Sequence, residues 1–184
     1  MTLLTAMVRG NQCVLSGDYR QTSIKDETEY YDNVEKVVQA NKNILLGFSG
    51  DVFFSQILGP KIYHFVKEDS TVDDIAIEIS KLLKKIATPK TQQTIFLVGK
   101  GNDEKTTIIE VSHHNGFEIT KYQGETYWLH TISEVNPGEL IRSNIYSLDE
   151  NIESLINFAK EVNHTVSQKD NWVSPKCKVI SLTV

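Results

Sequence analysis

Strand-forming and helix-forming segments are grouped along this chain rather than alternating. The segments 3–9 and 12–18 are predicted strands, joined by Gly10-Asn11 as a two-residue hairpin turn. Further strands follow, then two helices with apolar residues at helical spacing, and the same order repeats before a closing strand. Grouped elements favour antiparallel sheets with segregated helices, because a parallel sheet needs a crossover, usually a helix, between successive strands.

The predicted elements continue to the end of the chain. A surface loop is expected at 20–33; strands are predicted at 34–39, 44–49, 93–98, 106–111, 117–122, 126–130 and 177–183. One helix is predicted at 51–66 with a break or kink at Gly59-Pro60, and another after a Ser70 cap. A third is predicted after an Asn136 cap, and a fourth from the capping box at 147–150 to about 162. Two packed sheets with a helix pair on each outer side would bury every apolar face. The predicted fold class is therefore α+β, a four-layer αββα sandwich.

Composition narrows the class of protein. The chain has 184 residues, no linker and ordinary hydrophobic content, which predicts one domain over 1–184. The net charge of −5, with no basic run longer than Lys84-Lys85, makes nucleic acid and anionic membranes poor partners. Cys13 and Cys177 make no disulfide framework, and no apolar stretch suits a signal peptide or a membrane span. We expect a reduced, cytoplasmic protein.

The adjacent His113 and His114 do not suggest a metal site. Neighbouring residues in a strand or turn point to different sides, and no cysteine or carboxylate stands nearby at zinc-site spacing. We expect neither a metal nor a cofactor.

The chain begins with Met1-Thr2. Initiator methionine is normally removed before a small residue, so the mature chain is expected to start at Thr2. A threonine in that place carries a hydroxyl and an α-amine, whose ordinary pKa of about 7.7–8.0 suits a base near neutrality. A hydroxyl nucleophile activated by its own terminal amine is one recognised form of covalent catalysis.

With Thr2 at its head, this layout resembles the proteasome β-subunit and HslV-type peptidase family of N-terminal-nucleophile (Ntn) hydrolases. Four segments carry the resemblance: Ser16-Gly17-Asp18, the strand segment 33–37, the turn 46–51 and the strand 93–99. The first of these stands at the family's distance from Thr2 without a gap, and the second follows an apparent two-residue insertion. The resemblance is strongest over the first 60 residues.

The resemblance implies roles for four residues. Thr2 would attack a peptide carbonyl, and its own amine, directly or through a water, would take the proton. Lys36 would favour the neutral amine and the alkoxide through its positive charge, and Asp18 would pair with Lys36. The backbone amide of Gly50 would stabilise the oxyanion.

Two parts of the chain depart from the family pattern. The family has a Ser-Gly-rich turn over the nucleophile, whereas the corresponding stretch 131–136 has no glycine and offers only Ser133. The family also has an aspartate and a serine in the loop before the last strand. Asp170 (or Asn171) and Ser174 are the matches here, and their register stays open.

The resemblance implies a threonine endopeptidase that cleaves peptides or unfolded proteins inside a homo-oligomeric ring, for which an ATP-dependent unfoldase is a candidate partner. An extended substrate would lie along the cleft lined by Arg20, Thr22 and Ser49. Two alternatives stay open: a catalytically silent proteasome-like subunit, and an amide hydrolase of the same fold that acts on small molecules.

Overall fold

The computed structural model describes residues 2–22, 29–124, 126–131 and 135–184. The strands are β1 (Leu3–Arg9), β2 (Gln12–Asp18), β3 (Arg20–Thr22), β4 (Tyr30–Asp32), β5 (Val37–Asn41), β6 (Ile44–Gly50), β7 (Gln93–Lys100), β8 (Thr106–Ser112), β9 (Ile119–Gln123), β10 (Thr126–Thr131) and β11 (Cys177–Thr183). The α-helices are α1 (Val52–Phe65), α2 (Val72–Ile86), α3 (Gly138–Asn144) and α4 (Ile152–Ser167), with short 3-10 turns at His113–Asn115 and Ile145–Ser147.

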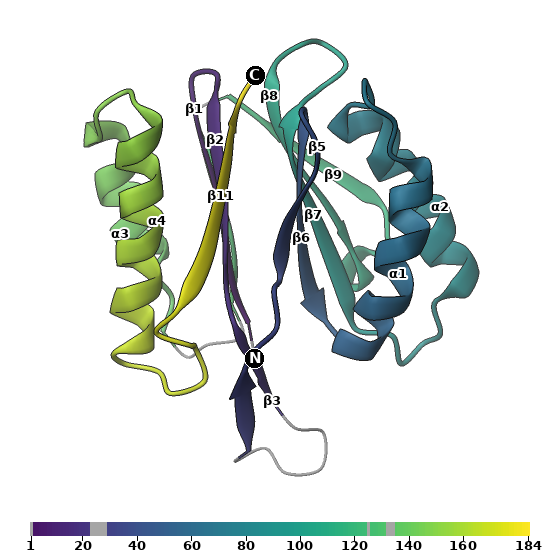
Figure 1. Ribbon diagram of the computed structural model, residues 1–184, viewed down its shortest axis with the longest axis horizontal. Coiled ribbons are helices and arrows are strands. Elements are labelled where there is room, and N and C mark those ends of the chain that lie inside the picture. Colours follow the sequence, from purple (N-terminus) through teal and green to yellow (C-terminus); the bar gives the residue numbers. More distant parts are fainter. Residues whose placement is uncertain (1, 23–28, 125, 132–134) are drawn as a thin grey trace.

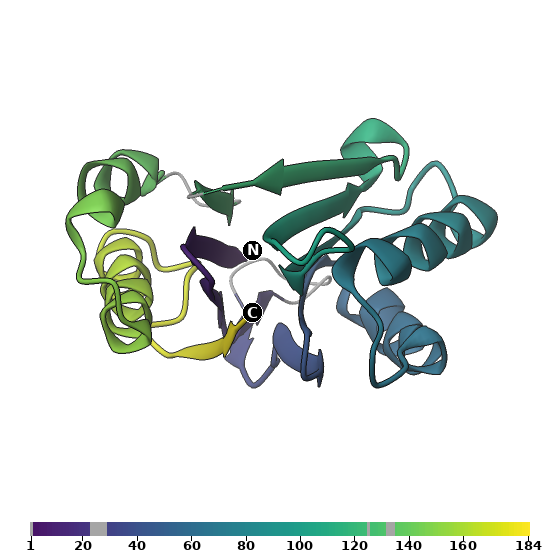
Figure 2. The ribbon, with the colours of Figure 1, turned by 90° about the horizontal axis from the view of Figure 1, so that it is seen from above.

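These elements form four layers. One antiparallel sheet has the strand order β10-β1-β2-β11, and the other has the order β5-β6-β7-β8-β9. The pair α3 and α4 covers the outer face of the first sheet, and the pair α1 and α2 covers the outer face of the second (Figure 1). Figure 2 shows the two sheets from above, enclosed between the helix pairs. The predicted four-layer αββα sandwich is confirmed.

Alternation along each strand produces three separate apolar layers. In β6, Ile44 and Leu46 face the helices α1 and α2, whereas Leu45 faces the other sheet. In β2, Leu15 lies between the sheets, and Val14 packs under α4. Both faces of both sheets are therefore buried, which explains why the central strands are apolar on both sides.

The helix starts differ from those predicted. The second helix is capped by Thr71 instead of Ser70, because Thr71 and Asp74 make a reciprocal capping box. The last helix is capped by Asn151 instead of the predicted box at 147–150, and it ends at Ser167 rather than near Val162.

Three further predictions about local structure are corrected. Pro60 lies inside a continuous α1, whose Leu58 and Ile62 are fully buried, so no break occurs there. The third helix has Pro137 at its N-cap position, and Asn136 accepts a hydrogen bond from the Gly138 amide instead. The expected surface loop contains a two-stranded sheet of β3 and β4. No helix in the described ranges is long and apolar enough to cross a membrane.

At Gly17 the chain leaves no room for a side chain between β2 and the segment that leads into β5. A Cβ on this residue would lie 2.8 Å from Leu4 Cδ2, and 3.1 Å from both Lys36 Cβ and Val37 Cγ1. Gly17 therefore lets the segment that carries Lys36 pack directly against β2. This contact brings the end of β2 next to the start of β5.

We predict that Gly17→Ala lowers the free energy of unfolding by about 1–3 kcal/mol, because the added methyl group overpacks this contact. Gly59→Ala is the matched control: Gly59 is helical, with nothing within 4 Å of its Cβ position. That control should raise stability by about 0.5–1 kcal/mol. Urea unfolding of both variants measures the difference, and equal effects would contradict the packing argument.

Candidate active site

The carboxylate of Asp18, at the end of β2, is fully buried and accepts four hydrogen bonds. Its Oδ1 accepts from the Leu3 amide at 2.8 Å and from Lys36 Nζ at 2.6 Å. Its Oδ2 accepts from the Arg20 amide at 2.9 Å and from the Ser174 amide at 3.3 Å. A buried carboxylate is tolerated only when it is paired in this way. Asp18 therefore fixes four parts of the chain around one point.

Lys36 is buried beside Asp18, with 5% of its side chain exposed. Burial lowers the pKa of its ammonium group below the ordinary value, and the negative charge of Asp18 acts in the opposite direction. The Lys36 carbonyl accepts a hydrogen bond from the Phe48 amide at 2.8 Å, which ties this residue to β6. The ion pair thus lies between the two sheets, where water does not screen it.

Thr2 is buried immediately before β1, and Met1 lies outside the described residues. The bond from the Leu3 amide to Asp18 holds the peptide group that joins Thr2 to Leu3. Thr2 therefore lies next to the Asp18–Lys36 pair. The structure brings together the residues to which the resemblance assigned the nucleophile, the lysine and the aspartate.

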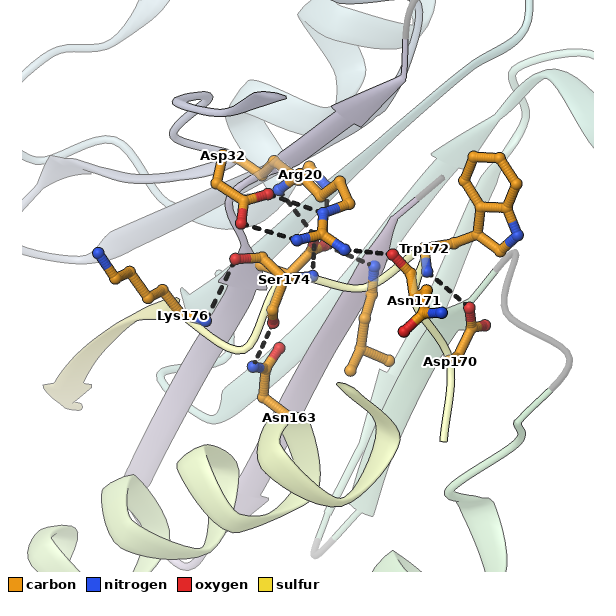
Figure 3. Close-up of polar contacts among 11 residues, drawn as sticks. Arg20, Asp32, Asn163, Asp170, Asn171, Trp172, Ser174 and Lys176 are labelled. Carbon is orange, nitrogen blue, oxygen red and sulfur yellow. Dashed lines mark hydrogen bonds and ion pairs between the residues drawn. The ribbon is translucent and has the colours of Figure 1, made fainter. Parts of the chain in front are cut away.

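Ser174, in the loop before β11, is held from several directions (Figure 3). Its amide donates to Asp18, its carbonyl accepts from Asn163 Nδ2 at 3.0 Å, and its hydroxyl accepts from the Lys176 amide at 3.2 Å. Ser174 is fully buried, so these contacts leave its backbone no freedom to turn.

The Arg20 side chain points into the protein. Its guanidinium makes two parallel bonds to Asp32, with Nε to Oδ1 at 2.7 Å and Nη2 to Oδ2 at 2.8 Å. A third bond reaches the Asn171 carbonyl, and the ring of Tyr30 lies 3.8 Å from the guanidinium carbon. Arg20 therefore connects β3 and β4 to the loop that carries Ser174 (Figure 3). Its predicted contact with substrate stays a prediction.

The Arg20–Asp32 ion pair shifts the pKa values of both its members. Hydrogen bonds from Arg20, and more weakly from Ser174, lower the pKa of the Asp32 carboxyl, although burial partly opposes them. The same bond to Asp32 raises the pKa of Arg20, again against burial. The pair is thus charged on both sides at neutral pH.

Asp170 lies at the opposite end of this loop from Ser174 (Figure 3). It is buried, and its Oδ1 accepts from the Trp172 amide at 2.7 Å, which closes a local turn. Of the three loop residues whose register was open, Ser174 is the one bonded to Asp18, and Asn171 meets Arg20 through its carbonyl.

Gly50 ends β6 with φ +120°, where a Cβ would lie 2.0 Å from the Gln92 carbonyl oxygen, so only glycine fits. Its role as an oxyanion donor stays a prediction. Ser49 is buried, and its hydroxyl has no hydrogen-bond partner among the described residues. Thr22 is half-buried in β3, opposite Tyr30. Ser133 lies outside the described residues.

Two residues of this network were missed by sequence reasoning. Asp32 falls in the segment expected to be an irregular loop, so nothing indicated that it faces Arg20. Asn163 did carry a signal: the buried face of α4 is otherwise apolar. Its other members are Leu155, Phe158, Ala159, Val162 and Val166.

Within the ranges that the structure describes, no group of three His, Cys, Asp or Glu side chains could hold a metal ion. The rings of His113 and His114 lie 3.9 Å apart, and His113 Nδ1 is 3.1 Å from the Gln93 carbonyl oxygen.

A known structure shares this architecture. The crystal structure of the eukaryotic HslV from Trypanosoma brucei matches the chain with a TM-score of 0.75, over 99% of each chain, at 16% sequence identity. No protein-family model and no curated protein sequence matches the chain. The HslV-like fold predicted from the sequence is therefore confirmed, and similarity at this identity shows the fold alone.

We predict that Asp32→Asn lowers the free energy of unfolding at pH 7 by about 1–3 kcal/mol, because it removes a charged acceptor from Arg20. The lowered pKa of Asp32 means that its stabilisation is present above the ordinary aspartate pKa of about 4 and is lost as the pH falls through the folded-state pKa. The variant should therefore lose less stability than the wild type between about pH 4 and pH 2. Urea unfolding at each pH tests this, with exposed Asp149→Asn as the control. Parallel pH curves for wild type and D32N would contradict the prediction.

Proposed function

We propose that this chain with an HslV-like fold is a threonine peptidase, in which Thr2 becomes the nucleophile once Met1 is removed. One observation carries the proposal: the buried Asp18–Lys36 pair, 2.6 Å apart, is bonded through Asp18 to the peptide group that follows Thr2. A buried ion pair is costly unless well satisfied, and such groups concentrate at functional sites. In this proposal the pair acts on the Thr2 hydroxyl and amine.

The proposed reaction proceeds through an ester. Thr2 Oγ attacks the carbonyl carbon of the substrate while its proton passes to the terminal amine, directly or through a water. The carbonyl oxygen becomes an oxyanion, for which the Gly50 amide is the proposed donor. Collapse breaks the C–N bond, the departing amine takes the proton, and a water then hydrolyses the ester to regenerate Thr2.

Lys36 supplies positive charge to this reaction. A cation beside the terminal amine favours the neutral, proton-accepting form of the amine and stabilises an alkoxide at Oγ. Burial alone would drive Lys36 toward its neutral form, and Asp18 opposes that tendency. We therefore assign Asp18 the role of holding Lys36 in place and keeping it charged.

The proposed substrate is an extended peptide segment of an unfolded protein in the cytoplasm. It would lie against β3 and the end of β6, bonded mainly through its backbone. The guanidinium of Arg20 is committed to Asp32 and Asn171, and the hydroxyl of Ser49 is buried. In this proposal Arg20 and Ser49 therefore contribute backbone and shape to the cleft, and Thr22 offers its half-buried side chain.

We predict that natively produced, active protein has an intact mass lower by one methionine, and that Thr2→Ala abolishes peptide hydrolysis. Thr2→Ser is the matched variant: it keeps a hydroxyl beside the amine and should retain part of the activity. Intact-mass spectrometry and a peptide panel measure both.

The alternatives give different results in the same experiment. Retained Met1 with no hydrolysis would support the silent subunit. Hydrolysis of small acyl-amides but not of peptides, lost in T2A, would support the amide hydrolase. Peptide hydrolysis that persists in clean T2A protein would exclude Thr2 as the nucleophile.

We also propose that copies of this chain assemble into a ring that encloses Thr2, as the resemblance to HslV-type peptidases implies. The helix α1 leaves large apolar side chains on its outer surface: Phe53 is 69% exposed, Tyr63 46% and Ile57 42%. An apolar surface of this kind is typical of a subunit contact. Closed rotational symmetry would then produce the chamber. An ATP-dependent unfoldase stays a candidate partner for the ring.

We predict an oligomer larger than a dimer at micromolar concentration, measured by sedimentation velocity. Phe53→Asp should shift the protein toward smaller species, because it places a charge in the proposed contact. Tyr146→Asp is the control, since Tyr146 is also an exposed aromatic residue, 56% exposed, but lies in the short turn between α3 and α4, in the opposite helical layer. A wild-type monomer of about the chain mass of 20.8 kDa would contradict the proposed ring.

A further inference from the structure

Asn163 is a polar residue in an otherwise apolar position. It lies on the buried face of α4 that packs over β2, and 2% of it is exposed. Asparagine is a weaker helix former than leucine or alanine, and a buried amide must be hydrogen-bonded to be tolerated. Packing alone would favour an apolar side chain at this position.

The side chain of Asn163 makes one directional contact. Its Nδ2 donates to the Ser174 carbonyl at 3.0 Å (Figure 3). A carbonyl can only accept, so this contact fixes which end of the amide is the nitrogen. The Oδ1 atom is buried and has no hydrogen-bond partner among the described residues. What Asn163 contributes is therefore a donor aimed at Ser174.

Ser174 connects Asn163 to Asp18. The amide on its N-terminal side donates to Asp18, and the carbonyl on its C-terminal side is held by Asn163. The next residue is Pro175, which has no N–H group of its own. The orientation of the Ser174 amide toward Asp18 is thus set from the helix side by Asn163, while the Ser174 hydroxyl accepts from the Lys176 amide further along the loop.

We propose that Asn163 is a positioning residue of this site. It holds the backbone of Ser174 so that the Ser174 amide supplies the fourth hydrogen bond to Asp18. Asp18 in turn holds Lys36, so the effect of Asn163 on the reaction passes through Ser174 and Asp18 without contact with the substrate. The consequence for catalysis rests on the proposed peptidase function, whereas the positioning itself does not.

The test compares Asn163→Asp and Asn163→Leu with Asn157→Asp and Asn157→Leu. Asn157 is exposed on the same helix and is the matched control. Both substitutions at 163 have nearly the shape of asparagine. At pH 8, where the measurements are compared, N163L lacks the donor, and N163D lacks it in its ionised form. We expect kcat to fall about 3- to 10-fold in both, which is typical for the loss of one hydrogen bond, with KM within about twofold of wild type. Both variants at 157 should keep wild-type values.

The pH dependence separates positioning from general damage to the fold. A buried carboxyl group has a raised pKa, and once protonated it donates through its O–H. The kcat of N163D relative to wild type should therefore recover as the pH falls from 8 toward 5.5, whereas that of N163L should stay low. A merely structural defect would give no such recovery.

Amide hydrogen exchange of residues 170–176, followed by mass spectrometry at each pH, gives a readout that needs no activity. Exchange should be faster than wild type in N163L at every pH, and in N163D at pH 8 but not at pH 5.5. This pattern in a protein without peptidase activity would overturn the proposed function but support the positioning of Ser174. Unchanged exchange and kcat in either variant at 163, or equal effects at 157, would overturn the inference. If one variant at 163 does not fold, the other still decides between these results.

Discussion

The buried carboxylate of Asp18 is the interaction on which the rest of this structure depends. Its four donors come from the start of β1, the residue before β5, the start of β3 and the loop before β11. Three are backbone amides, which cannot move without moving the chain, and one is the Lys36 ammonium. A carboxylate at this depth without them would carry a large desolvation cost. The hydrogen bonds that stabilise the Asp18 carboxylate therefore both hold the fold together and assemble the candidate site.

The two-sheet architecture makes this arrangement possible. Because β2 and the segment that carries Lys36 belong to different sheets, their ion pair lies between layers, where the dielectric is low. Gly17 brings the two segments within contact distance, and the helices shield the outer faces of both sheets from solvent. A second set of contacts, from Arg20, Asp32 and Asn163, holds the loop before β11, which carries Ser174. Support of this kind is what keeps a reactive group in one geometry.

Sequence reasoning predicted the parts that follow from local patterns. The first hairpin, the layers and the closing strand were visible in apolar spacing and turn residues, and the spacing from Thr2 to Asp18 was available by counting. The helix starts were wrong where neighbouring residues could all act as caps, as with Ser70 and Thr71, since the choice depends on which side chain meets its partner three residues on. Asp32 was missed because its partner lies in another strand. Asn163 shows that a polar residue on an apolar helix face is a usable signal, although Ser174, its partner, could not be identified from spacing.

The contact between Asp18 and Ser174 joins residues 156 positions apart in the chain. A ribosome delivers Thr2, Asp18 and Lys36 early and Ser174 late, so a growing chain holds the proposed nucleophile long before the cluster around Asp18 can close. During synthesis the sheet of β1 and β2 also lacks its neighbour β11. The order of synthesis therefore sets the order of assembly: the cluster around Asp18 is complete only after Ser174 has emerged from the ribosome.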